Sequence, residues 1–266
     1  MNTHPEPRHF KPSAKENPGF ATDAARVRTA TAFTSGSDDY DDVRPTYPPD
    51  VAELVADAHS LIDVGAGTGK LTSTLLRPGR FVGALDPSIS MLGILRSRLP
   101  EVPVWRATAE ATALAAGSMD AYVSAQTWHW VDTAAASAEA DRVVAPGGAL
   151  MLCWNTLDVS HPWVLRLSRI SHSGDVHREG FYPTVTAPWK LQRELRTRWF
   201  EAVTPEHLFA LARTRSYWLR ANEATRQKVT ANLSWYLYDR LGFDPGQPIP
   251  LPYRTDAFLY RRAGES

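Results

Sequence analysis

The sequence predicts an α/β fold built around a parallel sheet, and three observations carry this prediction. Short apolar runs alternate with segments of helical periodicity between about residues 50 and 156. A glycine-rich stretch, LIDVGAGTGKL at 61–71, directly follows the first apolar run. The chain has 266 residues, of which 43% are hydrophobic and 22% charged, as in ordinary globular proteins. Strands that alternate with helices imply βαβ units with right-handed crossovers.

The first half of the chain supplies most of the expected sheet. A helix is expected to begin near Pro49, with Val51, Leu54 and Val55 on one face. The elements expected after it are the strand 60–66, the helix 71–76, the strand 80–86, the helix 88–99 capped by Ser88, the strands 102–109 and 119–126, the helix 132–144, and the strand 148–155.

The second half is less regular. The segments expected there are the helix 161–171, the segment LQRELRTRWFEAV at 191–203 that fits either a helix or an alternating strand, the helix 204–215 with Thr204 as cap, the helix 222–241, the proline-rich loop 243–250, and the closing strand 253–262. We therefore divide the chain into a loosely ordered tail (1–25), an α/β core (26–156), a mostly helical insertion (157–250) and a closing strand with the C-terminus (251–266).

Composition excludes several classes of function. The formal net charge is +0, which does not favour nucleic acid as a partner. Cys153 is the only cysteine, so neither a disulfide within the chain nor a cysteine-based zinc site is expected. The histidines lack metal-ligand spacing, and we expect no metal. No apolar run approaches the roughly 20 residues that span a bilayer, and the N-terminus has no secretory h-region, so we expect a cytoplasmic protein without a membrane partner.

The glycine stretch is compatible with more than one ligand. A phosphate-binding P-loop would need a glycine where Val64 stands and a hydroxyl where Leu71 stands, so that interpretation fails twice. A dinucleotide turn needs G-x-G-x-x-G, whereas Gly65, Gly67 and Gly69 give G-x-G-x-G, which weakens that interpretation without excluding it. In each case the glycines let the backbone turn sharply and let a ligand approach closely.

Two acids extend the pattern. Asp86 ends the second strand, 86 − 63 = 23 positions after Asp63, where a carboxylate can accept both hydroxyls of a ribose. It could equally be a turn or capping aspartate before Pro87. Glu110 follows the third strand and could accept from an adenine amino group or be a solvated loop acid.

The motifs LIDVGAGTGKLT, LDPSISML, ATAEATALAAGSMDAYVSAQTWHWVD and ADRVVAPGGAL together resemble, in order and with normal spacing over roughly residues 40–156, the class I S-adenosylmethionine-dependent methyltransferases of the small-molecule type 11 group. This resemblance implies a Rossmann-like, doubly wound, seven-stranded sheet with the last strand antiparallel. It also implies S-adenosyl-L-methionine as cofactor and in-line methyl transfer to an oxygen, nitrogen or carbon nucleophile of a small-molecule acceptor. The insertion would then set the choice of substrate.

The resemblance also implies roles for individual residues. Asp63 supplies acidity near the turn, and Arg44 lies near the carboxylate of the cofactor, with Tyr40 closing over it. The alternative for the YDDVRPTYPPDV segment is a structural entry loop in which Arg44 pairs with a neighbouring aspartate. The other implied contacts are Gly65, Ala66 and Gly67 with the methionine part, Asp86 with the ribose, Met91 with the adenine face, Ala109 and Glu110 with the adenine edge, and Gln126 with the methionine end.

The segment AQTWHWVD is similar to a signature of trans-aconitate methyltransferase relatives. His129 could take a proton from the acceptor, or it could be a structural hydrogen-bonding residue beside the core aromatics Trp128 and Trp130. Two other functions stay open: a nicotinamide-dependent oxidoreductase, and a non-catalytic relative that acts as a partner protein. The sequence leaves the acceptor and the oligomeric state undetermined.

Overall fold

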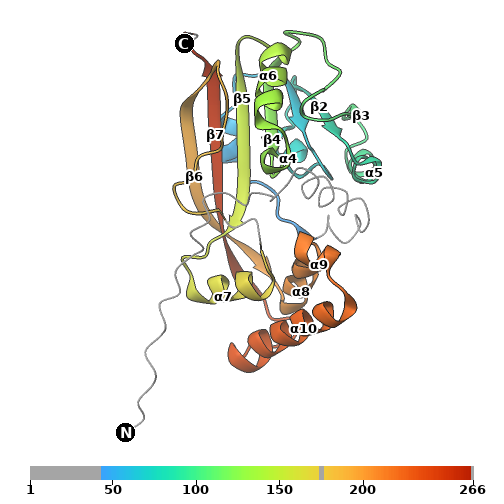
Figure 1. Ribbon diagram of the computed structural model, residues 1–266, viewed down its shortest axis with the longest axis vertical. Coiled ribbons are helices and arrows are strands. Elements are labelled where there is room, and N and C mark those ends of the chain that lie inside the picture. Colours follow the sequence, from blue (N-terminus) through green and yellow to red (C-terminus); the bar gives the residue numbers. More distant parts are fainter. Residues whose placement is uncertain (1–42, 174–176, 265–266) are drawn as a thin grey trace.

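The computed structural model describes residues 43–173 and 177–264, which form a seven-stranded sheet of order β3-β2-β1-β4-β5-β7-β6 (Figure 1). Strand β7 is antiparallel to both β5 and β6, whereas the pairs from β3 through β5 are parallel. The predicted seven-stranded sheet with an antiparallel last strand is thus confirmed. The strands are β1 (Ser60–Val64), β2 (Phe81–Asp86), β3 (Val104–Arg106), β4 (Met119–Ala125), β5 (Val144–Leu157), β6 (Trp189–Val203) and β7 (Ile249–Arg262).

Helices flank the sheet and form one end of the molecule (Figure 1). They are α3 (Asp50–Glu53), α4 (Lys70–Leu75), α5 (Ile89–Arg98), α6 (Thr133–Val143), α7 (Pro162–Ile170), α8 (Pro205–Arg213), α9 (Ser216–Arg220) and α10 (Glu223–Ser234), with a 3-10 turn η1 (Trp128–Trp130) and a π-helical turn η2 (Trp235–Arg240). The expected caps form: Ser88 accepts from the backbone of Met91, and Thr204 from that of His207.

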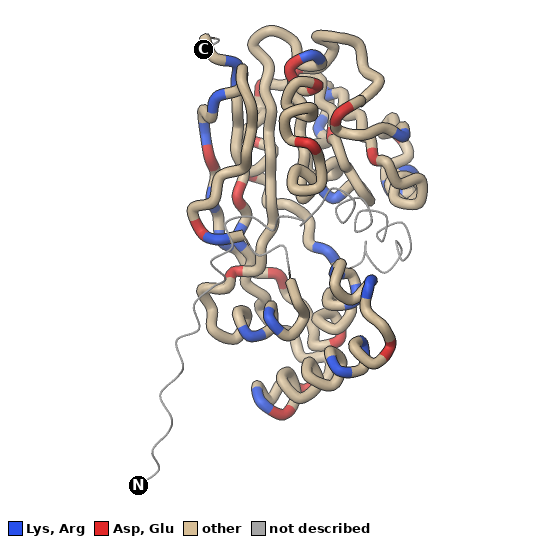
Figure 2. The backbone as a smooth tube through the Cα atoms, viewed as in Figure 1, with Lys and Arg blue, Asp and Glu red and all other residues tan. Residues whose placement is uncertain are grey.

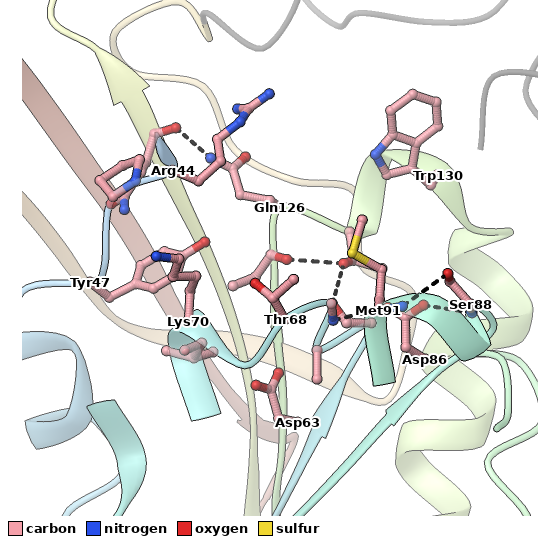
Figure 3. A pocket seen from close by; sticks show the side chains of 18 of the residues that line it. Arg44, Tyr47, Asp63, Thr68, Lys70, Asp86, Ser88, Met91, Gln126 and Trp130 are labelled. Atoms are coloured by element: carbon pink, nitrogen blue, oxygen red, sulfur yellow. Dashed lines mark hydrogen bonds between the residues drawn. The ribbon is translucent and has the colours of Figure 1, made fainter. Parts of the chain in front are cut away.

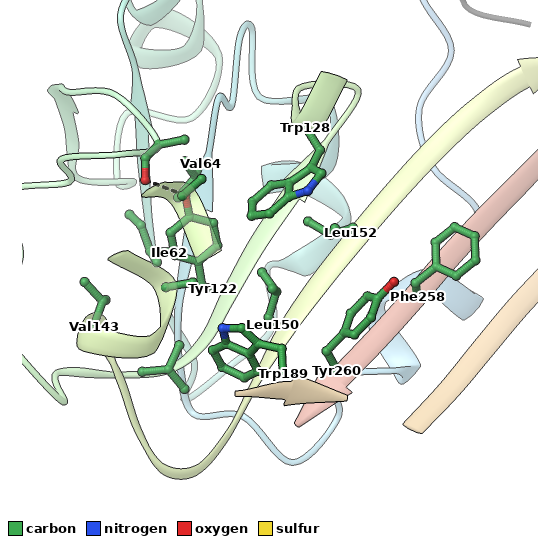
Figure 4. Close-up of a cluster of buried hydrophobic side chains, with 14 of the residues drawn as sticks. Ile62, Val64, Tyr122, Trp128, Val143, Leu150, Leu152, Trp189, Phe258 and Tyr260 are labelled. Atoms are coloured by element: carbon green, nitrogen blue, oxygen red, sulfur yellow. Dashed lines mark hydrogen bonds between the residues drawn. The ribbon is translucent and has the colours of Figure 1, made fainter. Parts of the chain in front are cut away.

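Each face of the sheet has its own core, because side chains alternate along a strand. In β5, Met151 and Cys153 join the cluster that contains α3 and α4, whereas Leu150 and Leu152 join the cluster under α6. Figure 4 shows the second cluster, where Trp128 and Tyr122 lie against the strands. Helix α6, expected over 132–144, forms and buries Ala136, Ala140 and Val143 in this second cluster.

A third core lies beyond the sheet proper. The long strands β5, β6 and β7 extend toward helices α7 to α10 (Figure 1). There Leu157, Val203 and Tyr253 pack against Leu208 and Leu233 of α8 and α10. This packing fixes the helical segment against the carboxyl end of β5.

The structure decides the segment that the sequence left open. LQRELRTRWFEAV belongs to β6, whose residues Trp189–Val203 pair with Arg262–Ile249 of β7. The described residues of the segment 157–250 therefore include a long edge strand as well as four α-helices. The sequence pattern of residues 191–203 alone is compatible with a helix or a strand. Pairing with the neighbouring strand β7 makes this segment a strand.

Three boundaries also differ from expectation. Strand β7 begins at Ile249, within the expected proline-rich loop, and β5 begins at Val144, before Pro146, with a register irregularity against β4. Helix α10 ends at Ser234 and continues as the π-helical turn η2. Pairing with a long neighbouring strand extends both β5 and β7 beyond what local composition indicates.

Acidic and basic residues are interspersed along the described chain (Figure 2).

Candidate functional site

A cavity of about 560 Å³ lies at the carboxyl ends of β1, β2 and β4 (Figure 3). This is the position where open α/β sheets bind ligands, and the volume is that of a small-molecule site. The core lines it with Asp63, Gly65, Ala66, Gly67, Thr68, Lys70, Leu71, Asp86, Pro87, Ser88, Met91, Arg106, Thr108, Ala125, Gln126, Thr127 and Trp130. The remaining lining residues are Arg44, Pro45, Tyr47, Asn155, Leu157, Arg215 and Tyr253.

The glycine turn forms the floor between β1 and α4. Gly65, Gly67 and Gly69 have φ values of 71°, 56° and 87°, which favour glycine over any other residue. A Cβ at Gly65 would lie 2.4 Å from the Thr127 side chain, whereas one at Gly67 would meet no protein atom within 4 Å. Gly67 therefore leaves room for a ligand rather than for a neighbouring side chain.

Asp86 is held beside this turn at the end of β2. Its Oδ2 accepts from the backbone N–H of Gly67 at 3.0 Å, and its Oδ1 accepts from that of Ser88 at 2.8 Å. Burial raises the pKa of Asp86, while these two backbone hydrogen bonds oppose the rise. The carboxylate is thus oriented and borders the cavity at the expected place.

Asp63 lies at the end of β1 and is almost fully buried. Its Oδ2 accepts from Thr72 Oγ1 at 2.6 Å, but its Oδ1 has no hydrogen-bond partner among the described residues. Burial raises the pKa of Asp63 to about 7, with the hydrogen bond from Thr72 opposing and the charge of Asp86 adding to the rise. An unpartnered carboxylate oxygen next to a cavity is a place for a donor from a ligand.

Gln126 follows β4 in a strained conformation, with φ of 53°. Its Nε2 donates to the carbonyl of Asn155 at 2.5 Å, while its buried Oε1 has no partner among the described residues. The hydrogen bond to a carbonyl orients the amide, since only the nitrogen can donate. Gln126 therefore contributes a second buried acceptor to the site of Asp63.

Arg44 lines the cavity from the segment that precedes α3. Its Nε donates to Thr214 Oγ1 at 3.0 Å, and its terminal nitrogen donates to the carbonyl of Thr214 at 3.3 Å. The segment from before α3 is thereby tied to the end of α8. Tyr40, predicted to act with Arg44, lies outside the described residues.

The comparisons with known proteins agree with this geometry. A family model described as a methyltransferase domain matches residues 62–152. An uncharacterised methyltransferase of Mycobacterium tuberculosis is 37% identical over 234 residues, which cover 87% of this chain and 96% of that protein. The chain belongs to the class I S-adenosylmethionine-dependent methyltransferase family.

This methyltransferase is also similar to proteins from other organisms. A methyltransferase-like protein of Schizosaccharomyces pombe is 29% identical over 244 residues, covering 85% of this chain and 93% of its own. A solved structure from Anaeromyxobacter dehalogenans, assigned as a type II methyltransferase, superposes with a TM-score of 0.61 at 22% identity, over 81% of this chain and 97% of that one. That likeness supports the fold. The finer resemblance to trans-aconitate methyltransferase relatives stays a prediction.

Most of the predicted cofactor residues of the methyltransferase meet at one cavity, but two do not line it. Arg44, Asp63, Gly65, Ala66, Gly67, Asp86, Met91 and Gln126 do. Ala109 is buried and its carbonyl accepts from Tyr122 Oη at 3.0 Å, while Glu110 accepts from the backbone of Asp132 at 2.9 Å. Thr108, one residue before Ala109, borders the cavity instead.

His129 is also absent from the cavity lining. Its Nδ1 accepts from Trp154 Nε1 at 3.4 Å, and its ring centroid lies 4.9 Å from that of Trp130 and 6.2 Å from that of His177. Its partner Trp154 belongs to the core under α6, whereas Trp130 borders the cavity. A role for His129 as proton acceptor stays a prediction, and this placement gives it no support.

Sequence reasoning missed several lining residues. Arg106 ends β3 and Thr108 follows it two residues later, so the rule that ligands bind at the carboxyl ends of strands could have indicated both. Arg215 and Tyr253 come from the irregular second half and reach the cavity only through tertiary packing, so no local signal marks them. Within residues 43–173 and 177–264, no group of three or more histidine, cysteine, aspartate or glutamate residues is arranged to hold a metal. No helix in that part of the chain is both long and apolar enough to cross a membrane.

Proposed function

We propose that this methyltransferase transfers a methyl group from S-adenosyl-L-methionine to a small-molecule acceptor. The observation that supports the proposal best is the pair of buried carboxylates, Asp63 and Asp86, on either side of a glycine turn that leaves open space at Gly67. In this proposal the core up to residue 156 supplies most of the cofactor site, and the segment 157–250 helps to form the acceptor side.

The amino-acid part of the cofactor fits the unpartnered groups of the cavity. Asp63 Oδ1 and Gln126 Oε1 are buried acceptors without partners among the described residues, and an ammonium group supplies donors for both. Arg44 is fixed by Thr214 and would receive the carboxylate. The backbone of Gly65 to Gly67 would lie along the chain between these groups.

The nucleoside part fits the end of β2 and the start of α5. Asp86, oriented by two backbone N–H groups, would accept from the ribose hydroxyls. Met91 and Ser88 would flank the adenine, with Thr108 at its edge in place of the predicted Ala109 and Glu110. A pyrophosphate would instead place its negative charge close to Asp63 and Asp86, which favours the sulfonium nucleoside over a nicotinamide dinucleotide.

Methyl transfer mainly requires that the protein align the acceptor with the methyl group and exclude water. When bound, S-adenosylmethionine supplies an electrophilic methyl group whose leaving group is a neutral thioether. The chain would hold the acceptor in line with the methyl group, and the buried walls of the cavity would keep water out. The face of Trp130, which lines the cavity, would attract the positive sulfonium.

The cavity offers few groups that could accept a proton. Among the described lining residues there is no histidine, and the only carboxylates are Asp63 and Asp86, which the proposal assigns to the cofactor. The acceptor atom would therefore enter as a nucleophile that needs no base from this set of residues.

Isothermal titration with S-adenosylhomocysteine tests the cofactor assignment. We expect micromolar binding by the wild-type chain and weaker binding by Asp86→Asn, with no heat from NADH. Absence of binding at millimolar ligand, or preferential binding of NADH, would refute the proposal. Cofactor binding without transfer of a radiolabelled methyl group to any of a broad panel of acceptors would instead favour the non-catalytic relative.

A further inference from the structure

The order of the strands divides the cavity into two sides. Asp63 and Asp86, which the proposed function assigns to the cofactor, lie at the carboxyl ends of β1 and β2. Beyond β1 the sheet continues with β4, β5 and β7, and Leu157 of β5 and Tyr253 of β7 also line the cavity. The side next to β5 and β7 is therefore the one that the proposed function leaves for the methyl acceptor.

This acceptor side has an apolar wall, formed by Pro45, Tyr47, Leu157 and Tyr253. Leu157 and Tyr253 are direct partners across β5 and β7, and each is only 3% exposed. Pro45 and Tyr47 are buried as well, and the carbonyl of Thr46 between them accepts a hydrogen bond from β5. Walls of this kind hold the apolar parts of small-molecule ligands.

The polar groups beside the apolar wall are bonded within the protein. Asn155, which lies two residues before Leu157 and also lines the cavity, uses both ends of its side-chain amide. Its Nδ2 donates to the carbonyl of Thr46 at 3.0 Å, and its Oδ1 accepts from Thr255 Oγ1 at 2.6 Å. Thr255 Oγ1 in turn accepts from Trp199 Nε1 at 2.8 Å. These groups therefore hold the wall in place and are already satisfied without a ligand.

Three cationic residues of the lining are likewise engaged within the protein. Arg44 donates to Thr214 and, under the proposed function, receives the cofactor carboxylate. Burial raises the pKa of Glu201, and the charge of the nearby Lys70 opposes the rise. Arg215 also interacts with another group of the protein. An acceptor can therefore gain affinity on this side chiefly by burying apolar surface.

The apolar wall is held rigidly from behind. The ring of Tyr253 is stacked on that of Trp199, with centroids 5.1 Å apart and an angle of 21° between the planes. Leu157 and Tyr253 both belong to the third core, where they pack with Leu208 and Leu233. A wall that is fixed before the ligand arrives costs little to order on binding and limits the size of what it accepts.

We propose that the methyl acceptor is a predominantly apolar small molecule whose body packs against the apolar wall, and that Leu157 limits the length of this body. The inference rests on the proposed function. Each methylene group buried at the wall should strengthen binding about fourfold. A hydroxyl in the same place would lose its hydrogen bonds to water and find no partner in return, which weakens binding.

Pairs of probes that differ only by CH₃ against OH test the apolar class. The pairs are 4-propylphenol with 4-(2-hydroxyethyl)phenol and heptan-1-ol with hexane-1,6-diol, each titrated by calorimetry into the full chain with saturating S-adenosylhomocysteine. We expect the apolar member of at least one pair to bind about fivefold or more tightly than its polar partner. Equal or tighter binding of the polar member in both pairs, or no binding of either apolar member up to its solubility limit, would overturn the proposal.

Variants of Leu157 test the length limit. Leu157→Ala removes three carbons from the wall, and 4-hexylphenol is longer than 4-propylphenol by three methylene groups. The affinity of 4-hexylphenol relative to 4-propylphenol should therefore rise about tenfold or more in Leu157→Ala. The milder Leu157→Val, which disturbs the core less, should raise the same ratio by a smaller factor.

Leu251→Ala is the matched control. Leu251 is fully buried in the same third core and lies in β7, but it is not one of the cavity-lining residues. This substitution should leave the ratio of the two phenols within about twofold of wild type, although it too removes a buried leucine side chain. A ratio that does not rise in either Leu157 variant, or that rises as much in Leu251→Ala, would show that Leu157 does not limit the acceptor.

The binding of S-adenosylhomocysteine, measured first for each protein, keeps the two proposals apart. If it binds but the probes fail as described, the apolar acceptor is wrong and the proposed function stands. If the wild-type chain does not bind S-adenosylhomocysteine, both proposals are wrong.

Discussion

Replacing Asp63 with asparagine should stabilise this protein while weakening its cofactor site. Asp63 is almost fully buried, one of its carboxylate oxygens has no partner among the described residues, and burial raises its pKa from 3.8 to about 7. The folded state therefore holds a proton between these two pKa values that the unfolded state releases. Stability is lost as pH rises through this window, and the loss is complete above about pH 7. Asparagine has nearly the same shape and no charge, so it avoids the loss.

The two pKa values set the size of the effect. Linkage gives a gain in the free energy of unfolding of about 1 kcal/mol at pH 4.5 and about 4 kcal/mol at pH 8 for Asp63→Asn. The hydrogen bond from Thr72 can be kept by the asparagine oxygen, so it does not alter the sign. Loss of the charge should raise the dissociation constant of S-adenosylhomocysteine about 10- to 100-fold at pH 8, if Asp63 receives the ammonium group.

Urea unfolding of both proteins at the two pH values measures the difference. Asp120→Asn is the control of opposite sign. The pKa of Asp120 is lowered. Burial alone would raise it, but the backbone N–H groups of His59 and Ser60 donate to the carboxylate and outweigh that effect. That substitution should destabilise the protein by nearly the same amount at pH 4.5 and pH 8, because the stability from a lowered pKa is already present above the ordinary value of 3.8. A gain for Asp63→Asn that is equal at both pH values, or a loss that grows with pH, would refute the reasoning.

Three further substitutions test the site and its frame. Asp86→Asn should weaken S-adenosylhomocysteine binding about 10- to 100-fold by calorimetry, because an amide cannot accept from two backbone donors as the carboxylate does; unchanged affinity would contradict the ribose assignment. Gly65→Ala should lower the free energy of unfolding by about 2–4 kcal/mol in urea, since its Cβ would lie 2.4 Å from Thr127 at a φ of 71°; adding Thr127→Ala should restore part of the loss. Glu139→Gln should destabilise the protein at pH 7 but not near pH 2. The hydrogen bond from Arg142 lowers the pKa of Glu139 to about 2, so the stability that its charge contributes disappears as pH falls from about 4.5 toward 2. An equal loss of stability at both pH values would rule out the charge as its source.

The core of the fold could be predicted from local signals. The strands of the first half are short apolar runs between turn residues, and caps such as Ser88 and Thr204 form as their residue types suggest. The second half could not be predicted as well. The residues of β6 alternate in a way that also suits a helix, and only the long partner strand β7 decides between the two. The start of β7 at Ile249 is set in the same way by its neighbour.

The site residues of the first half of the chain could likewise be predicted better than those of the second half. Asp63, Asp86 and the glycines lie where strand ends converge, so their spacing in sequence was enough to indicate a ligand site. His129 was predicted from its place after β4, but the 3-10 turn that follows the strand carries Trp130 toward the cavity and leaves His129 against Trp154. Arg215 is 86 or more residues away from all of these, and only the packing of α8 and α9 brings it to the cavity.

Two residues at the cavity carry features that cost this protein stability. Asp63 and Gln126 each have a buried oxygen without a partner among the described residues, and Gln126 also has a left-handed backbone. A chain selected for stability alone would replace such groups with apolar or uncharged residues. The two oxygens are instead complementary to hydrogen-bond donors of a ligand. These costs therefore point to the ligand site independently of the sequence motifs.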